Sequence, residues 1–394
     1  MKIPNEQPAP ETPPRLLLNP VLEGSSAYPL VRLDERRAEL EEKGHSLFDF
    51  GTGDPREPTD PKIRQALIDG VPEVSRYPSA TGTRGLREAF AGYMRRRYGV
   101  GLDPDTQVLP ASGSKEAIFH APLAFLHPSH ERRGVAYGTP GYPVYERGAL
   151  FAGGETLAVR LREENGFLLP LEEIDVAKAR VVWINYPHNP TGATAPLSYL
   201  EELAAFCREH DVLLMSDECY NDVFEGEAPP SVLEVTGERV LAFVSLSKRS
   251  GMTGYRSAMM AGDPGMISAL KKLRPSIGAA SPGFVSEAAA AAWNDDEHVK
   301  ERNRVFARKR ALFTSFLERA GFRWTPTNAS LYLWAEVPNG YGGDDEAYAL
   351  RLLEEGILVA PGSAFGPGGE GYIRVALVPT LAECARAIER WEEL

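Results

Sequence analysis

The sequence has few of the features that mark disulfide-bonded, membrane-spanning or nucleic-acid-binding proteins. Its three cysteines, Cys207, Cys219 and Cys384, lie far apart and form no Cys-X-X-Cys or Cys/His metal spacing. An odd, scattered set excludes a disulfide framework and favours a reducing compartment. No apolar run approaches the roughly 20 residues of a membrane span. The net charge of -12, without a basic stripe, argues against a nucleic-acid partner. We therefore expect a cytoplasmic protein with no membrane or nucleic-acid partner and no metal.

What is present is the composition of an ordinary globular protein, with 43% hydrophobic and 25% charged residues. The 394 residues allow roughly two domains with substantial cores. Residues 1–15 are rich in proline and glutamate and contain no apolar stretch. We expect them to form a disordered arm rather than a signal peptide.

Short apolar segments alternate with amphipathic ones between about residues 85 and 265. This pattern predicts strands at 107–110, 134–137, 179–186, 212–215, 240–246 and 257–261, and helices at 86–98, 115–126 and 198–210. Strands that alternate with helices indicate a mostly parallel sheet covered on both faces. Ligands of such sheets bind beyond the carboxyl ends of the strands.

The pattern changes after about residue 265. The sequence predicts helices at 266–273 and 298–320, a loop at 274–282, strands at 330–337, 357–361 and 372–378, and a closing helix from 381. These elements predict a separate α+β module, and we expect segment 16–52 to fold back onto it.

Two polar segments follow predicted strands and suit phosphate and oxygen ligands. Residues 111–115, Ala-Ser-Gly-Ser-Lys, stand at a predicted helix start, where free backbone N–H groups and the helix dipole favour a phosphate. Residues 186–192, Tyr-Pro-His-Asn-Pro-Thr-Gly, form a rigid turn in which Asn189 can present its amide to an oxygen. Residues 111–115 alone are a weak signal, because small residues at helix starts are common, and residues 186–192 alone are equally consistent with a structural turn.

Two further segments carry charged side chains. Asp217 follows a buried strand, where a carboxylate beside a pyridine nitrogen keeps that nitrogen protonated, and Tyr220 can reach the oxygen of the same ring. Asp217 could equally be a helix N-cap. Lys248 follows the strand at 240–246 and suits a Schiff base, and Arg256 suits a phosphate. These residues together point to pyridoxal phosphate (PLP).

The order of these segments resembles the fold type I PLP-dependent aminotransferases, over about residues 28 to 394. Asn-Pro-Thr-Gly at 189–192, Asp-Glu-Cys-Tyr at 217–220 and Ser-Leu-Ser-Lys-Arg-Ser at 245–250 carry the resemblance. It implies an α/β fold with a mostly parallel seven-stranded sheet flanked by helices. The large PLP-binding domain would be 53–274, and the smaller α+β domain would combine 16–52 with 275–394.

The resemblance also implies roles for single residues. Lys248 would hold PLP and move the substrate proton, Asp217 would pair with the ring nitrogen, and Asn189 and Tyr220 would bond the ring oxygen. The phosphate would be bound by Ser114, Lys115, Ser245 and Arg256, with Tyr142 stacked on the ring. Tyr77 would reach the phosphate of a neighbouring subunit, which implies a homodimer with shared active sites. Gly53, Asn189 and Arg374 would bind the substrate, with Arg374 clamping its α-carboxylate.

Several segments resemble bacterial N-succinyldiaminopimelate aminotransferases, namely residues 53–61, 76–90, 245–257, 360–366 and 374–384. This resemblance implies a ping-pong exchange between N-succinyl-LL-2,6-diaminopimelate and 2-oxoglutarate/glutamate in lysine biosynthesis. Distal carboxylates would require further cations, for which Arg56, Arg84 and Arg249 are candidates. Residues 328–334 and 251–255 depart from the usual pattern of these enzymes and lie near the active site in the family, so other substrates stay open.

The alternatives keep the fold and change the reaction or the substrate. The substrate could be aspartate, alanine, an aromatic amino acid or kynurenine, or the enzyme could be a carbon–sulfur β-lyase. A PLP-binding transcription regulator is not expected, because the residues before 28 contain no basic helices of the kind a winged-helix domain requires.

Overall fold

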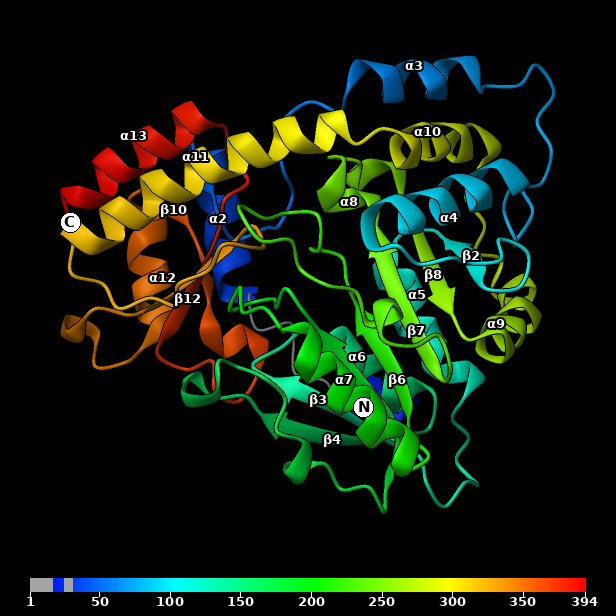
Figure 1. Cartoon of the computed structure of the whole chain (residues 1–394). Coiled ribbons are helices and arrows are strands. Elements are labelled where there is room, and N and C mark those ends of the chain that lie inside the picture. Colours follow the sequence, from blue (N-terminus) through cyan, green and yellow to red (C-terminus); the bar gives the residue numbers. More distant parts are fainter. Residues whose placement is uncertain (1–16, 25–30) are drawn as a thin grey trace, which may run out of the picture.

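The computed structural model describes residues 17–24 and 31–394 (Figure 1). The arm predicted for residues 1–15 lies outside the described residues. No helix in the described part of the chain is both long and apolar enough to cross a membrane.

A seven-stranded sheet forms the centre of the larger part of the molecule, in the order β2-β8-β7-β6-β5-β3-β4. The strands are β2 Val108–Ala111, β3 Gly134–Thr139, β4 Glu155–Arg160, β5 Ala179–Asn185, β6 Leu213–Asp217, β7 Val240–Ser245 and β8 Ala258–Gly262. Only β8 runs antiparallel to its neighbours. The prediction of a mostly parallel seven-stranded sheet is confirmed.

Helices cover both faces of this sheet. Alternate side chains of a strand point to opposite faces: Val182 and Leu214 join the core under α4 (Arg84–Tyr98), α7 (Leu197–Glu209) and α10 (Gly283–Asn294). Their neighbours Val181 and Leu213 join the core under α5 (Ser114–His120), α6 (Val144–Phe151) and α9 (Pro264–Ile277). Both faces are therefore apolar, which explains why the sequence of these strands is continuously apolar rather than alternating.

A second core lies beside the large sheet. It is built on the antiparallel strands β9 (Tyr332–Glu336), β11 (Ala360–Pro361) and β12 (Tyr372–Ala376), and on α2 (Val31–Glu42), α11 (Glu297–Arg319), α12 (Asp345–Glu354) and α13 (Leu381–Glu392). Strand β1 (Phe48–Asp49) pairs with β10 (Ile357–Leu358), so the N-terminal segment packs on the C-terminal one. In Figure 1, α11 and α13 lie side by side over this core.

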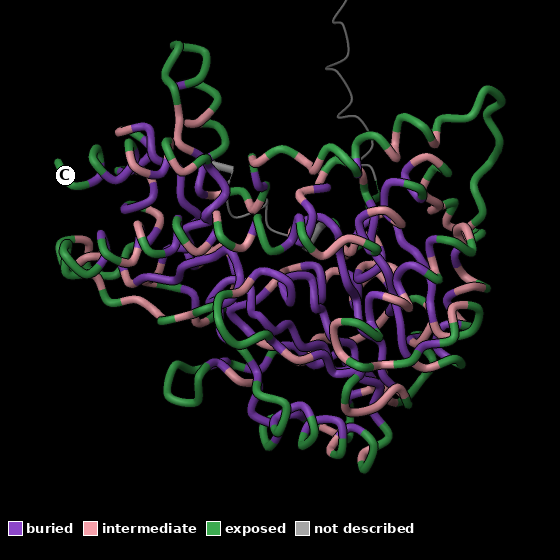
Figure 2. The backbone as a smooth tube through the Cα atoms, turned by 45° about the horizontal axis from the view of Figure 1, so that its top comes forward, coloured by how far each residue is buried: buried purple, intermediate pink, exposed green. Residues whose placement is uncertain are grey.

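Burial along the backbone follows these two cores. Figure 2 shows buried backbone through the strands and exposed backbone at the peripheral turns and outer helix faces.

Helix α10 packs on α3 (Pro61–Asp69) and α4, and its Trp293 belongs to the core of the large sheet. The domain boundary expected at residue 275 stays a prediction, and the packing of α10 favours a boundary near residue 297.

Some predicted elements differ in extent. The helix expected at 115–126 ends at His120 and continues as the 3₁₀ turn Ala121–Ala124, because Pro122 lacks the N–H that would continue the helical bonding. The loop expected at 274–282 starts later, since α9 runs to Ile277 with Pro275 in its last turn. The strand expected at 357–361 is divided into β10 and β11, which pair with different strands.

Candidate active site

A cavity of about 460 Å³ opens at the carboxyl ends of the parallel strands. Strands β5, β6 and β7 are adjacent and end at Asn185, Asp217 and Ser245, and Asn185 is the register partner of Asp217. The predicted site residues that line this cavity are Gly53, Ser114, Lys115, Tyr142, Asn189, Asp217, Tyr220, Ser245, Lys248, Arg256 and Arg374. The volume lies within the usual range for small-molecule sites.

Lys248 stands in the short helix α8 (Leu246–Arg249), directly after β7. Ser245 begins this helix, and its hydroxyl accepts a hydrogen bond of 3.1 Å from the backbone nitrogen of Ser247. The Lys248 amine donates to the backbone carbonyl of Gly53. Burial lowers the pKa of Lys248, and the nearby Arg374 guanidinium acts in the same direction. A lower pKa leaves more of the free amine, the form that acts as a nucleophile or base.

Asp217 is the last residue of β6 and is buried. Its Oδ2 accepts a 2.8 Å hydrogen bond from the hydroxyl of Tyr145, and its Oδ1 accepts one of 3.3 Å from the backbone nitrogen of Cys219. Residues 219–222 form a turn rather than a helix, so Asp217 does not cap one. Burial raises the pKa of Asp217. A buried carboxylate at the cavity wall is stabilised by a positive charge placed against it, and a protonated ring nitrogen supplies one.

Asn189 and Arg374 meet across the cavity from different parts of the fold. Arg374, in the centre of β12, donates from Nη1 to Asn189 Oδ1 at 2.7 Å and from Nη2 to the Gly51 carbonyl at 2.6 Å. Its guanidinium carbon lies 4.2 Å from the ring centroid of Tyr332 and 4.6 Å from that of Phe365. The planar fork is thus held in a fixed orientation at the cavity wall, as bidentate carboxylate binding requires.

Tyr220 is hydrogen-bonded to Tyr332, which the sequence indicates only as part of the segment 328–334. Its hydroxyl lies 3.1 Å from the hydroxyl of Tyr332, in β9. Burial raises the pKa of Tyr220, and Tyr332 adds to this effect. Tyr332 also fills the space beside Gly53, because a Cβ at Gly53 would lie 2.3 Å from the Tyr332 hydroxyl. No spacing rule in the sequence marks Tyr332, since β9 joins the site only through tertiary packing.

Another part of the site combines cationic side chains with the backbone of a glycine. Gly113 has a φ of +93°, and a Cβ there would lie 2.1 Å from Nη2 of Arg256. Arg256 is itself in the left-handed conformation and donates from Nη1 to the Thr253 carbonyl at 2.9 Å. Lys115 lies 5.9 Å from the ring centroid of Tyr142. Positive charge thus lies next to the backbone of Gly113 at the start of α5, an arrangement that suits a phosphate.

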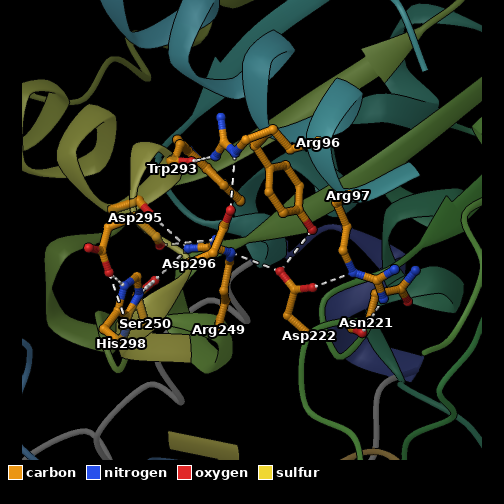
Figure 3. Close-up of polar contacts among 12 residues, drawn as sticks. Arg96, Arg97, Asn221, Asp222, Arg249, Ser250, Trp293, Asp295, Asp296 and His298 are labelled. Carbon is orange, nitrogen blue, oxygen red and sulfur yellow. Dashed lines mark hydrogen bonds and ion pairs between the residues drawn. The ribbon is translucent and has the colours of Figure 1, made fainter. Parts of the chain in front are cut away.

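Four of the residues considered in the sequence lie elsewhere in this chain. Tyr77 is fully exposed between α3 and α4, and its role at a neighbouring subunit stays a prediction. The three arginines considered for distal carboxylates do not line the cavity. Arg56 pairs with Glu383 and Arg84 with Glu88, as surface ion pairs. Arg249 points away from the cavity into a buried network (Figure 3).

The wall also contains residues for which the sequence predicted no role of their own. They are Asp34, Gly51, Thr52, Pro143, Cys219, Ser247, Tyr332, Ala360, Ala364 and Phe365. Asp34 comes from α2, far along the chain from the strand ends. Cys219 could have been considered, because it stands between Asp217 and Tyr220.

Comparison with known proteins places the chain in a family. The sequence model of the aminotransferase class I and II family matches residues 45–390. The LL-diaminopimelate aminotransferase of Aquifex aeolicus is 38% identical over 93% of this chain and 96% of its own length. A probable N-succinyldiaminopimelate aminotransferase structure from Thermus thermophilus has a TM-score of 0.86 at 31% identity, covering 92% of this chain and 99% of that one. An aspartate aminotransferase mutant structure from the same organism has a TM-score of 0.89 at 25% identity, covering 96% and 100%.

The chain therefore belongs to the class I and II aminotransferases. Its fold is that of the fold type I PLP enzymes, and it is a PLP-dependent transaminase. The residues present fit the cofactor. Lysine and arginine side chains at 115, 248, 256 and 374 outnumber the lining carboxylates of Asp34 and Asp217, as an anionic cofactor with anionic substrates requires.

The buried carboxylate of Asp217 gives a test of the cofactor site. In the cofactor-free protein its raised pKa means that folding favours the protonated form. Its contribution to stability is present at low pH and is lost as pH rises from about 3.9 through the raised folded-state pKa. Asp217→Asn should therefore raise the Tm of the cofactor-free protein at pH 8 by more than at pH 4, while weakening PLP binding. Thermal unfolding across this pH range and PLP titration measure both effects.

The control for removing one negative charge is Glu227→Gln, at an exposed position outside the cavity wall. An Asp217→Asn change in Tm that is the same at every pH would contradict the assignment of a buried, uncompensated carboxylate.

Proposed function

We propose that this aminotransferase acts on a substrate of the diaminopimelate class, with glutamate and 2-oxoglutarate as the second substrate pair. The observation that carries the proposal is one cavity in which the Lys248 amine, the Asp217 carboxylate and the Arg374 fork converge. The curated relatives support the substrate class, since the one from Aquifex aeolicus is an LL-diaminopimelate aminotransferase. Exchange with 2-oxoglutarate would follow a ping-pong order and serve lysine biosynthesis.

The side chains at the strand ends suit the roles expected for them. When bound, PLP supplies an aromatic ring that accepts charge from the substrate Cα. Asp217 would pair with the ring nitrogen, while Tyr220 and the Asn189 amide would donate to the ring oxygen. Arg256, Ser245, Ser114 and Lys115 would bind the phosphate, with Tyr142 beside the ring. Lys248 would hold the cofactor and then take up and return the substrate proton, for which its lowered pKa suits it.

Arg374 would bind the substrate α-carboxylate. Its Nη1 and Nη2 each have one contact to the protein, to Asn189 and to Gly51, which fixes the plane of the guanidinium. The remaining N–H groups of these two nitrogens can donate to the two oxygens of a carboxylate. Gly53 leaves the approach open, because a side chain there would collide with Tyr332.

The distal end of the substrate distinguishes the free from the N-succinyl compound. Free LL-diaminopimelate carries an ammonium and a carboxylate at that end, whereas the N-succinyl compound carries an amide and two carboxylates. Asp34 is an exposed carboxylate on the wall of the cavity, in α2. A carboxylate there favours a distal ammonium and disfavours added negative charge. We therefore propose free LL-diaminopimelate as the preferred substrate, rather than the N-succinyl compound expected from the sequence.

A homodimer is part of the proposal. The segment from α3 to Tyr77 exposes Ile68, Val71 and Val74 together with Tyr77, all more than half exposed. Such a concentration of apolar side chains is typical of a protein interface. Tyr77 would then reach the phosphate bound by the neighbouring subunit.

A cytoplasmic location, and the division into domains at about residues 52 and 275–297, remain proposals as well.

A panel of amino donors tests the substrate class. With 2-oxoglutarate as acceptor, we expect kcat/KM to be highest for LL-diaminopimelate, lower for its N-succinyl derivative, and lower again for aspartate, alanine and kynurenine. The measurement is glutamate formation under initial-rate conditions. A preference for the N-succinyl compound would overturn the choice of free substrate. Release of pyruvate from cystathionine without a keto acid would instead identify a β-lyase.

Asp34→Asn tests whether the Asp34 carboxylate binds the distal ammonium of the substrate. Loss of the charge should raise KM for LL-diaminopimelate, by roughly tenfold for a contact of about 1.4 kcal/mol, and leave KM for glutamate nearly unchanged. For the N-succinyl compound, kcat/KM of the variant should be no lower than that of the wild type. The neighbouring Glu35→Gln, also exposed on α2 but absent from the cavity wall, is the matched control. Equal increases in KM for LL-diaminopimelate and for glutamate would contradict a role of Asp34 in binding the distal ammonium.

Lys248→Ala tests the assignment of the reactive amine. The variant should lose transamination and the visible absorption that borohydride abolishes in the wild type, because no other amine takes its place. Lys115→Ala, which removes a different amine of the same cavity, should keep the borohydride-sensitive band. Full turnover by Lys248→Ala would overturn the proposed role.

A further inference from the structure

Arg249 directly follows Lys248, and its side chain points away from the cavity and is only 2% exposed. All five N–H groups of its guanidinium have acceptors (Figure 3). Nε donates to Asp222 Oδ2 at 2.8 Å, Nη1 to the Ala292 carbonyl at 2.7 Å and Ser250 Oγ at 3.4 Å, and Nη2 to Asp296 Oδ1 at 2.8 Å and the Asp295 carbonyl at 3.4 Å. Because every N–H group of this planar guanidinium is hydrogen-bonded, both the position and the plane of the side chain are fixed.

Aromatic rings enclose the same guanidinium. Its central carbon lies 4.9 Å from the ring centroid of Tyr93 and 5.1 Å from that of Trp293. These rings come from α4 and α10, which pack on each other. The charge is therefore bound between two helices of the large core, and a lysine could not reproduce both the stacking and the five donors.

Asp222 connects Arg249 to the other wall of the active site. Its buried carboxylate also accepts from the Tyr93 hydroxyl at 2.8 Å and from Arg97 Nε at 3.1 Å. It stands two residues after Tyr220 in the turn that follows β6. The ion pair of Arg249 and Asp222 thus ties the turn that bears Lys248 to the turn that bears Tyr220.

Ser250 supplies a second attachment of the same turn. Its hydroxyl lies 2.8 Å from His298 Nε2, and His298 Nδ1 lies 2.7 Å from Asp295 Oδ2. The order of these groups is that of a hydrolase triad. Ser250 is fully buried and lines none of the cavities described above, so the hydroxyl is inaccessible to a substrate. The contact instead fixes the backbone one residue beyond Arg249 (Figure 3).

We propose that Arg249, through its buried pair with Asp222, is a positioning residue that sets the place of the Lys248 amine relative to Tyr220 and Asp217. The inference rests on the role proposed for Lys248 and deepens it. One peptide unit joins the Cα atoms of Lys248 and Arg249, about 3.8 Å apart, so a shift of Arg249 displaces Lys248. Loss of this pair removes the direct link between the two turns and weakens the compensation of two buried charges, since Asp222 then keeps only Arg97 and Arg249 only Asp296. We expect the two turns to separate and admit water.

The test compares Arg249→Lys and Asp222→Asn with a matched control, Arg97→Lys. Arg97 contacts the same Asp222 carboxylate, but its other hydrogen bonds go to the carbonyls of Asn221 and Pro229 rather than to the turn of Lys248. In the cofactor-free proteins, the pH dependence of Lys248 acylation, followed by mass spectrometry of its peptide, reports the pKa of the amine. We expect that pKa to rise toward the ordinary lysine value in the first two variants, and to stay at the wild-type value in Arg97→Lys.

The loaded enzymes give a second measurement. Arg249→Lys and Asp222→Asn should lower kcat about 10- to 100-fold, as a misplaced catalytic group does, with KM for glutamate nearly unchanged. The primary deuterium isotope effect on kcat with α-deuterated glutamate should increase, because proton transfer by Lys248 becomes slower. If Arg249→Lys does not fold, Asp222→Asn carries the same two measurements.

The outcomes separate this inference from the proposed function. A Lys248 pKa and kcat unchanged in both Arg249→Lys and Asp222→Asn would overturn the positioning role, as would equal losses in Arg97→Lys. A wild-type protein that transaminates none of the diaminopimelate compounds would overturn the proposed substrate, while the acylation profile of Lys248 would still report on Arg249.

Discussion

The site depends on the parallel pairing of β5, β6 and β7. Since these strands run in one direction, their carboxyl ends meet at one edge, and the residues that follow each strand are neighbours in space. Side chains 189, 217 and 245, far apart in the sequence, thereby face one cavity. The apolar cores on both faces of the sheet hold this register, because a slip by one residue would turn every buried side chain to the opposite face. The chemistry is thus fixed by packing that lies beneath the cavity.

The antiparallel sheet of the second core completes the site from the other side. Arg374 and Tyr332 are on adjacent strands of that sheet, and both touch groups from the large sheet, at Asn189 and Tyr220. The N-terminal segment adds the Gly53 carbonyl, which bonds to the Lys248 amine. The cavity therefore lies where three distant stretches of the chain converge, and its electrostatics are a property of their mutual placement rather than of any one motif.

The sequence allowed prediction of the parallel sheet and of the cavity residues that follow strands or stand in motifs. Apolar strands and turn residues are local signals, so β5, β6 and β7 and the side chains after them could be found. Asp34 could not, because α2 reaches the cavity through tertiary packing that no local pattern encodes. Tyr332 was indicated only as part of the segment 328–334, with no role of its own. The sequence did not predict α10, which is rich in alanine and has one charged residue, or α6, which has eight residues and only the adjacent charges Glu146 and Arg147. Arg249 was misplaced for a related reason: proximity in sequence to Lys248 says nothing about which way a side chain points from a short helix.

The close approach of Gly53 and Tyr332 has an evolutionary consequence. A methyl group at position 53 would overlap the phenol oxygen at 2.3 Å, but would lie 3.2 Å from the ring carbon that bears it. A lineage that exchanged Tyr332 for phenylalanine could then accept alanine at position 53 with a shift of the ring by a few tenths of an ångström, whereas the reverse order of changes would pass through a clashing intermediate. The two positions are therefore epistatic, and the order in which they change is constrained by a single oxygen atom.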